Sequence, residues 1–161
     1  MLRFDTPATR EFWQQACHSA GVEPATTHHA GTFAEPRTPE RAPFLDQLSM
    51  MAADGQKCGT AHMKLQFDHE TIPMRRPGDC WIVTTVAGDP LCVVRITGVA
   101  ITPFEDVGDA FAASEGEGDL SVVHWRGAHI NYFRDQCEKW GHTWHDAMPI
   151  VCESFELIYA P

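Results

Sequence analysis

Two apolar runs joined by a short turn constrain the fold of this 161-residue chain more than any other feature of its sequence. The runs are CWIVTTV (80–86) and LCVVRITGVAI (91–101), and the segment AGDP between them has the composition of a tight turn. Both runs place apolar residues on both faces of the expected strands, which excludes a sheet with one face in water. The pattern predicts two consecutive strands inside a barrel or inside a sheet covered by helices.

Helices are predicted on both sides of this strand pair. Thr6 can cap the first helix, Pro7 suits its first position, and Gly21 is placed to end it. The apolar spacing and the capping residues predict helices over residues 7–20, 42–55, about 108–114, and a longer segment capped by Asp119.

Two further strands are predicted. In TAHMKLQF (60–67) apolar and polar residues alternate, so Thr60, His62 and Lys64 are expected on one polar side of a half-buried strand. A closing strand is expected over 148–161. The segment 23–41 has no clear period and is expected to be a surface loop with His28 and His29 solvated.

The order of these elements is helices, strands, helices, strand. Regular alternation of strand and helix is absent, which argues against a doubly wound parallel sheet. The length suits one domain with an N-terminal extension. We therefore expect an α+β protein, built on a small β-barrel of mixed or antiparallel strands with helices around it.

Charge and composition narrow the functional classes. The formal net charge of −10 argues against a protein that binds nucleic acid through bulk positive charge. No apolar run is long enough for a transmembrane helix, and the N-terminus lacks the apolar core of a signal peptide. The six scattered cysteines form no C-x-x-C pair. We expect a cytoplasmic protein with reduced cysteines and no membrane partner.

Lys57 and Thr60 form the first candidate for chemistry. A threonine hydroxyl needs a base to become a nucleophile, and a lysine whose pKa is lowered can be that base. His62 and Lys64 are expected to help lower the pKa of Lys57. The structural alternative is a lysine that complements a helix C-terminus and a threonine that opens a strand. From these residues alone, the structural alternative is preferred.

Amide hydrolysis would also need an acid for the leaving amine. Glu115 is the candidate if its pKa is raised in an enclosed cleft, and Glu117 is the second choice. The alternatives for this acidic segment are a solvated loop that caps the next helix and, less favoured, a site for a divalent metal. Core packing is the preferred interpretation of His129, and phosphate contact or base stacking is the functional alternative for His129 and Arg126.

Metal ligation is the weaker interpretation elsewhere too. His142 and His145 lie three residues apart with Cys137 nearby, but no second cluster has the spacing of a zinc site. The sequence predicts neither a required metal nor another cofactor.

Several segments together resemble the ASCH domain family, a relative of the PUA barrels. GQKCGT resembles the family's G-x-K-x-x-T signature, although Cys58, Gly59 and His62 depart from the residues common there. Further resemblance lies in RRPGDCWIVTTVAGDPLCVVRITGVAITPFEDV, AASEGEGDLSVVHWRGAHINYF and VCESFELIY, and spans about residues 44–159. The helix-rich segments resemble those of the longer bacterial members.

The resemblance implies a PUA-like β-barrel with a cleft between barrel and helices. It implies an ASCH domain over 43–161, with residues 1–42 forming an N-terminal helix and linker that pack on it. In family members that resemble amidohydrolases, the signature lysine and threonine and a later glutamate form the catalytic set. These positions correspond here to Lys57, Thr60 and Glu115.

The function expected from this resemblance is removal of an acyl group from the exocyclic amine of cytidine, as in N4-acetylcytidine. His62, Lys64, Glu117, Arg126 and His129 are the expected substrate-binding residues. Two other functions stay open. One is an RNA-binding module, with or without cleavage of single-stranded RNA, and the other is a ligand-binding regulator without turnover.

Overall fold

A computed structural model describes all residues from Met1 to Pro161. The helices are α1 (Pro7–Ala20), α2 (Ala42–Ala53), α3 (Lys64–Glu70), α4 (Asp109–Ser114) and α5 (Val122–Lys139), with 3₁₀ turns η1 (Pro39–Arg41) and η2 (Phe104–Asp106). The strands are β1 (Arg3–Phe4), β2 (His28–Gly31), β3 (Gly59–Met63), β4 (Cys80–Thr84), β5 (Pro90–Pro103) and β6 (Pro149–Tyr159). None of the five α-helices has the length and hydropathy needed to cross a membrane.

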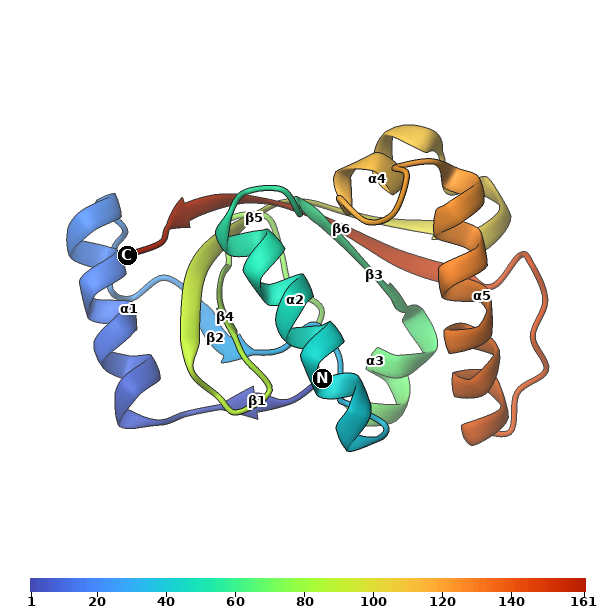
Figure 1. Cartoon of the computed structure of the whole chain (residues 1–161), viewed down its shortest axis with the longest axis horizontal. Helices are drawn as coiled ribbons and strands as arrows, with labels where there is room; N and C mark the ends of the chain where they lie inside the picture. The colour runs from blue at the N-terminus through green and yellow to red at the C-terminus, as the bar shows by residue number, and fades with distance from the viewer.

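All six strands form one sheet in the order β1-β2-β4-β5-β6-β3 (Figure 1). The pairs are antiparallel except β2 with β4, which run parallel. The mixed α+β class is confirmed. However, β1 and β3 are sheet edges that do not pair with one another, so the sheet is not closed and the expected barrel is not confirmed.

Helices cover both faces of the central strands, which explains the doubly apolar runs. On β4, Cys80 and Ile82 pack with α1, whereas Trp81 and Val83 pack with α2. A separate cluster of buried hydrophobic side chains joins β3 and β6 to α4 and α5. Figure 1 shows α1 at one end of the sheet, α5 at the other and α2 between them. This arrangement leaves β3 flanked by two helices that are far apart in the sequence.

Several local predictions are confirmed. Thr6 caps α1 by accepting a hydrogen bond from the Thr9 amide, and Gly21 ends the helix in the left-handed region. The second helix, the short helix and the closing strand also lie where expected. The cap of α5 is different: Ser121 is its N-cap, and Asp119 accepts hydrogen bonds from Ser121.

Two predictions are wrong. The strand expected over 60–67 ends at Met63, and Lys64 begins helix α3, where its ammonium pairs with Asp68 one turn later. The segment 23–41 is not simply a loop, since it contains β2 and η1. His28 is exposed as expected, but the side chain of His29 accepts a hydrogen bond from Arg75.

Candidate functional site

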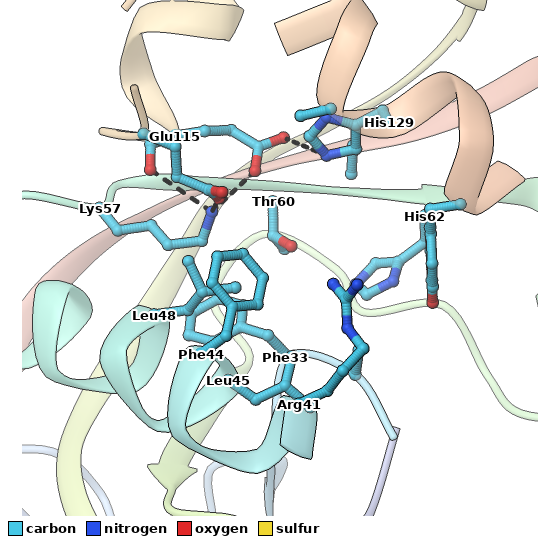
Figure 2. A pocket seen from close by; sticks show the side chains of 15 residues that line it. Phe33, Arg41, Phe44, Leu45, Leu48, Lys57, Thr60, His62, Glu115 and His129 are labelled. Carbon is cyan, nitrogen blue, oxygen red and sulfur yellow. Dashed lines mark hydrogen bonds and ion pairs between the residues drawn. The ribbon is translucent and has the colours of Figure 1, made fainter. Parts of the chain in front are cut away.

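A cavity of about 120 Å³ lies between α2, β3 and α5. Its lining includes six of the eight predicted site residues: Lys57, Thr60, His62, Glu115, Glu117 and His129 (Figure 2). Apolar side chains of α2 and Phe33 form the opposite wall. The cavity therefore combines an apolar wall with a cluster of polar and ionisable groups.

Lys57 enters the cavity from the turn after α2. Gly55 adopts φ +72° there, and the Lys57 amide donates to the carbonyl of Met51, so the chain reverses and directs the lysine side chain inward. The Lys57 side chain is only 1% exposed, and its Nζ lies 5.1 Å from the centroid of the Phe33 ring. An amine in so little water needs charged or polar partners.

Two carboxylates supply these partners. Lys57 Nζ donates to Glu115 Oε2 and to Glu117 Oε1, each at 2.7 Å. Glu115 is 2% exposed and Glu117 is 20% exposed, so Glu115 is the inner carboxylate and Glu117 the outer one. The result is a buried lysine shared by two acids on one loop.

Glycines allow this loop to present both acids to Lys57. Gly116 and Gly118 have φ angles of +74° and +61°, in the region that favours glycine. A Cβ on Gly116 would lie 2.6 Å from the carbonyl oxygen of Gln56, so only glycine fits where the loop meets the segment before Lys57. The alternation of Glu and Gly thus has a steric cause.

The second oxygen of Glu115 is held by α5. Trp125 Nε1 donates to Glu115 Oε1 at 2.8 Å, and His129 Nε2 lies 3.8 Å from the same oxygen. The Nδ1 of His129 is 2.9 Å from the Trp125 carbonyl, which can only accept, so Nδ1 carries the hydrogen. The other ring nitrogen of His129, Nε2, therefore faces Glu115.

The pKa shifts of the central pair differ from the sequence-based expectation. Burial favours the neutral form of Lys57, but the charges of Glu115 and Glu117 outweigh burial and raise its pKa above the ordinary 10.5. Burial likewise opposes ionisation of Glu115, but the charge of Lys57 dominates and lowers the pKa of Glu115 below 4.5. The expected lowered pKa of Lys57 and raised pKa of Glu115 are therefore both wrong.

Thr60 and His62 line the cavity from β3. They lie two residues apart on one face of the strand, as the alternation predicted, and are 5% and 3% exposed. The Thr60 side chain makes no hydrogen bond, and none joins it to Lys57. Burial, followed by the charge of Arg75, lowers the pKa of His62 well below 6.5, so its ring is neutral at pH 7. The Thr60 hydroxyl is therefore free of hydrogen bonds and lines the same cavity as the buried Lys57–Glu115 ion pair.

A buried ion pair behind this wall was missed by the sequence analysis. Glu153 stands opposite Thr60 in the β3–β6 register, is fully buried and pairs with Arg75. Its Oε2 lies 4.0 Å from His62 Nε2, and His62 Nε2 has no hydrogen-bond partner. The available signal was a single acidic residue at an inward position of the apolar run IVCESF.

Two predicted site residues lie outside the cavity. Lys64 is in α3, and the Arg126 guanidinium donates to the carbonyls of Glu105 and Val107. His142 lies with its Nε2 3.4 Å from that of His69, and no group of three or more His, Cys, Asp or Glu side chains is placed to hold a metal ion.

Comparison with known proteins identifies relatives of this arrangement. The family model described as ASCH domain matches residues 39–159. The crystal structure of an ASCH domain from Lactobacillus crispatus JV V101 is 28% identical, with a TM-score of 0.84, and the match covers 98% of this chain and 99% of that one. The crystal structure of a protein from Enterococcus faecalis V583 is 21% identical, with a TM-score of 0.78, and the match covers 96% of this chain and 94% of that one. At this identity the match indicates a shared fold and nothing about function. The comparison with curated proteins gave no significant match.

Proposed function

Because the chain belongs to the ASCH domain family, we propose that it is a metal-independent amidohydrolase that removes an acyl group from the exocyclic amine of a cytidine-type nucleoside. One observation carries the proposal: the free hydroxyl of Thr60 and the buried Lys57–Glu115 ion pair line the same small cavity. A nucleophile, a cation and a proton acceptor are the groups that acyl transfer from an amide requires.

The directions of the pKa shifts of Lys57 and Glu115 support one assignment of roles to Thr60, Lys57 and Glu115. Thr60 attacks the acyl carbon and gives its proton to Lys57 while Lys57 passes a proton to the Glu115 carboxylate. Lys57 is an ammonium before and after this transfer, and it stabilises the negative charge that develops on the acyl oxygen. Glu115 becomes the carboxylic acid that the next step needs.

The second half of the cycle returns every group to its starting state. Glu115 protonates the leaving nitrogen, the carbon–nitrogen bond breaks, and the acyl group remains on Thr60 as an ester. Water then attacks this ester, and its proton follows the same route to Glu115. Glu115 returns that proton to the Thr60 oxygen as the ester bond breaks, so the Thr60 hydroxyl and the Glu115 carboxylate are restored. The carboxylic acid product leaves and loses its own proton to solvent. Trp125 keeps the Glu115 carboxyl oriented throughout by donating to Oε1, the oxygen that does not bind Lys57.

Cavity size and charge favour a small substrate. The volume of about 120 Å³ is well below the roughly 300–1,000 Å³ of sites that enclose drug-sized ligands, so the cavity suits an acylated pyrimidine ring. The net charge of −10 repels long polyanions more than a nucleoside. Both properties favour a nucleoside over RNA.

The test is turnover of N4-acetylcytidine by wild-type protein in the presence of a metal chelator, followed by ultraviolet absorbance. We expect steady release of cytidine. No release, combined with steeply salt-dependent binding to a short single-stranded RNA, would replace the hydrolase with the RNA-binding function. Binding of the nucleoside without release would identify a regulator that has lost catalysis.

The dependence of rate on pH is expected to be flat around neutrality. The reactive form needs Glu115 ionised, which is lost only below 4.5 because its pKa is lowered, and Lys57 protonated, which is lost only above 10.5 because its pKa is raised. We therefore expect kcat/KM to vary less than about twofold between about pH 6 and about pH 9.

Initial rates corrected for spontaneous hydrolysis in each buffer would measure this profile. An acidic limb centred near 6.5 would contradict the proposed proton route, because a group that titrates in the range of an imidazole would then carry the essential proton.

A further inference from the structure

The exposed members of the cavity lining mark its mouth. They are Arg41 at the start of α2, Phe44 one turn later, and Ala128 on α5. Thr60 is buried on the inner wall, so an acyl carbon in contact with Thr60 requires the acylated end of the substrate to enter first. Because the cavity is too small for a whole nucleoside, the sugar must lie at the mouth.

Arg41 is the charged group that this sugar would meet. Its guanidinium carbon lies 5.3 Å from the centroid of the Phe44 ring, and its nitrogens make no hydrogen bond or ion pair with the rest of the chain. In Figure 2 the guanidinium points toward the strand that carries Thr60 and His62. An arginine stacked on an aromatic ring with free donors is well suited to bind a planar or tetrahedral anion.

The other charges of the cavity do not provide such a site. Lys57 is paired with both Glu115 and Glu117, so the three groups together carry a net negative charge that would repel a permanent anion placed deep in the cavity. An anion can therefore be favourable only at the mouth. In a protein with 22 acidic and 12 basic residues, a local cation is also needed to offset the repulsion of an anionic ligand.

We propose that Arg41 binds an anionic group of the substrate, and that the substrate is an acylated cytidine nucleotide with a phosphate on its ribose. The proposal rests on the proposed function, because the orientation of the substrate follows from attack by Thr60. The same guanidinium chemistry would accept a carboxylate at the end of a longer acyl group. The ribose phosphate is favoured because the acyl end points away from the mouth.

Three substrates separate these possibilities: N4-acetylcytidine, N4-acetylcytidine 5′-monophosphate, and N4-succinylcytidine, which carries a carboxylate on its acyl group. For wild type we expect kcat/KM for the monophosphate to exceed that for the nucleoside by about tenfold or more, as for a charge-assisted contact. Arg41→Gln is expected to bring the ratio close to one by lowering kcat/KM for the monophosphate much more than kcat/KM for the nucleoside. Arg76→Gln is the matched control, since Arg76 is exposed and lies outside the cavity.

Equal efficiency for monophosphate and nucleoside in wild type would overturn the phosphate assignment, as would an unchanged ratio in Arg41→Gln. A preference for the succinyl substrate that depends on Arg41 would overturn it in favour of an acyl carboxylate. Absence of turnover with all three would instead refute the proposed hydrolase. In that case thermal stabilisation by cytidine 5′-monophosphate over cytidine, lost in Arg41→Gln, would still support the anion site, and its absence would refute it.

Discussion

Replacing Thr60 with valine is expected to lower kcat/KM for N4-acetylcytidine by about 10³-fold, because the variant keeps the shape of the side chain and loses only the proposed nucleophile. The Thr60 hydroxyl makes no hydrogen bond with another residue, so its removal leaves no other polar group without a partner. The free energy of unfolding should change by less than about 1 kcal/mol. Steady-state kinetics and urea unfolding of the same preparation measure both effects.

Thr84 provides a matched control for this substitution. It is a fully buried strand threonine whose Oγ1 also has no partner, but it lies on β4, outside the cavity. Thr84→Val should leave turnover unchanged. If Thr60→Val retained turnover within tenfold of wild type, the attacking group would have to be water, and the covalent step on Thr60 would be wrong.

Replacing Lys57 with methionine is expected to abolish turnover and to destabilise the fold by about 3–5 kcal/mol, because it leaves the carboxylate of Glu115 buried without its cation. The stability loss should be smaller at acid pH, where Glu115 can take up a proton. Chemical unfolding at two pH values, with turnover measured in parallel, tests both parts.

A second substitution separates the two effects. Adding Glu115→Gln removes the stranded charge while keeping an acceptor for Trp125, so the double variant should recover much of the stability and none of the activity. Lys64→Met is the control, since Lys64 is partly exposed and pairs only with Asp68. Turnover in Lys57→Met close to wild type would remove Lys57 from the mechanism.

Local chemistry was sufficient to predict four of the five α-helices, and only α3 was missed. The limits of α1 follow from the capping hydroxyl of Thr6 and the left-handed Gly21, both set by neighbouring residues. The strand β2 could not be predicted in the same way, because its few residues have loop-like composition. It exists through parallel pairing with β4, about 50 residues later.

The boundary between β3 and α3 shows where periodicity alone fails. Alternation of polar and apolar residues continues through TAHMKLQF, yet the chain becomes helical at Lys64. The helix buries Gln66 and Phe67, two consecutive residues that a strand would direct to opposite faces. Short segments of this kind satisfy both patterns, and tertiary packing decides between them.

The resemblance indicated part of the lining of the cavity, but Lys64 and Arg126 lie outside it, and the protonation of the lining was not predicted. The signature residues and the acidic loop led to Lys57, Thr60 and Glu115, and these line one cavity. The sequence placed cationic neighbours near Lys57, whereas the folded chain places two carboxylates there. The charges around the Lys57 amine come from a segment almost 60 residues later in the chain. The residues next to Lys57 in the sequence therefore do not predict them.

The edge position of β3 also has a consequence for the order in which the site forms. The only strand that pairs with β3 is β6, which begins at Pro149, so the wall that carries Thr60 has no sheet partner until β6 is available. Contacts of such long sequence separation form late in folding, because closing the intervening chain costs entropy. A growing chain on the ribosome would therefore contain Lys57 and Thr60 long before β3 has its partner strand, and the cavity that they line would form only with the native sheet.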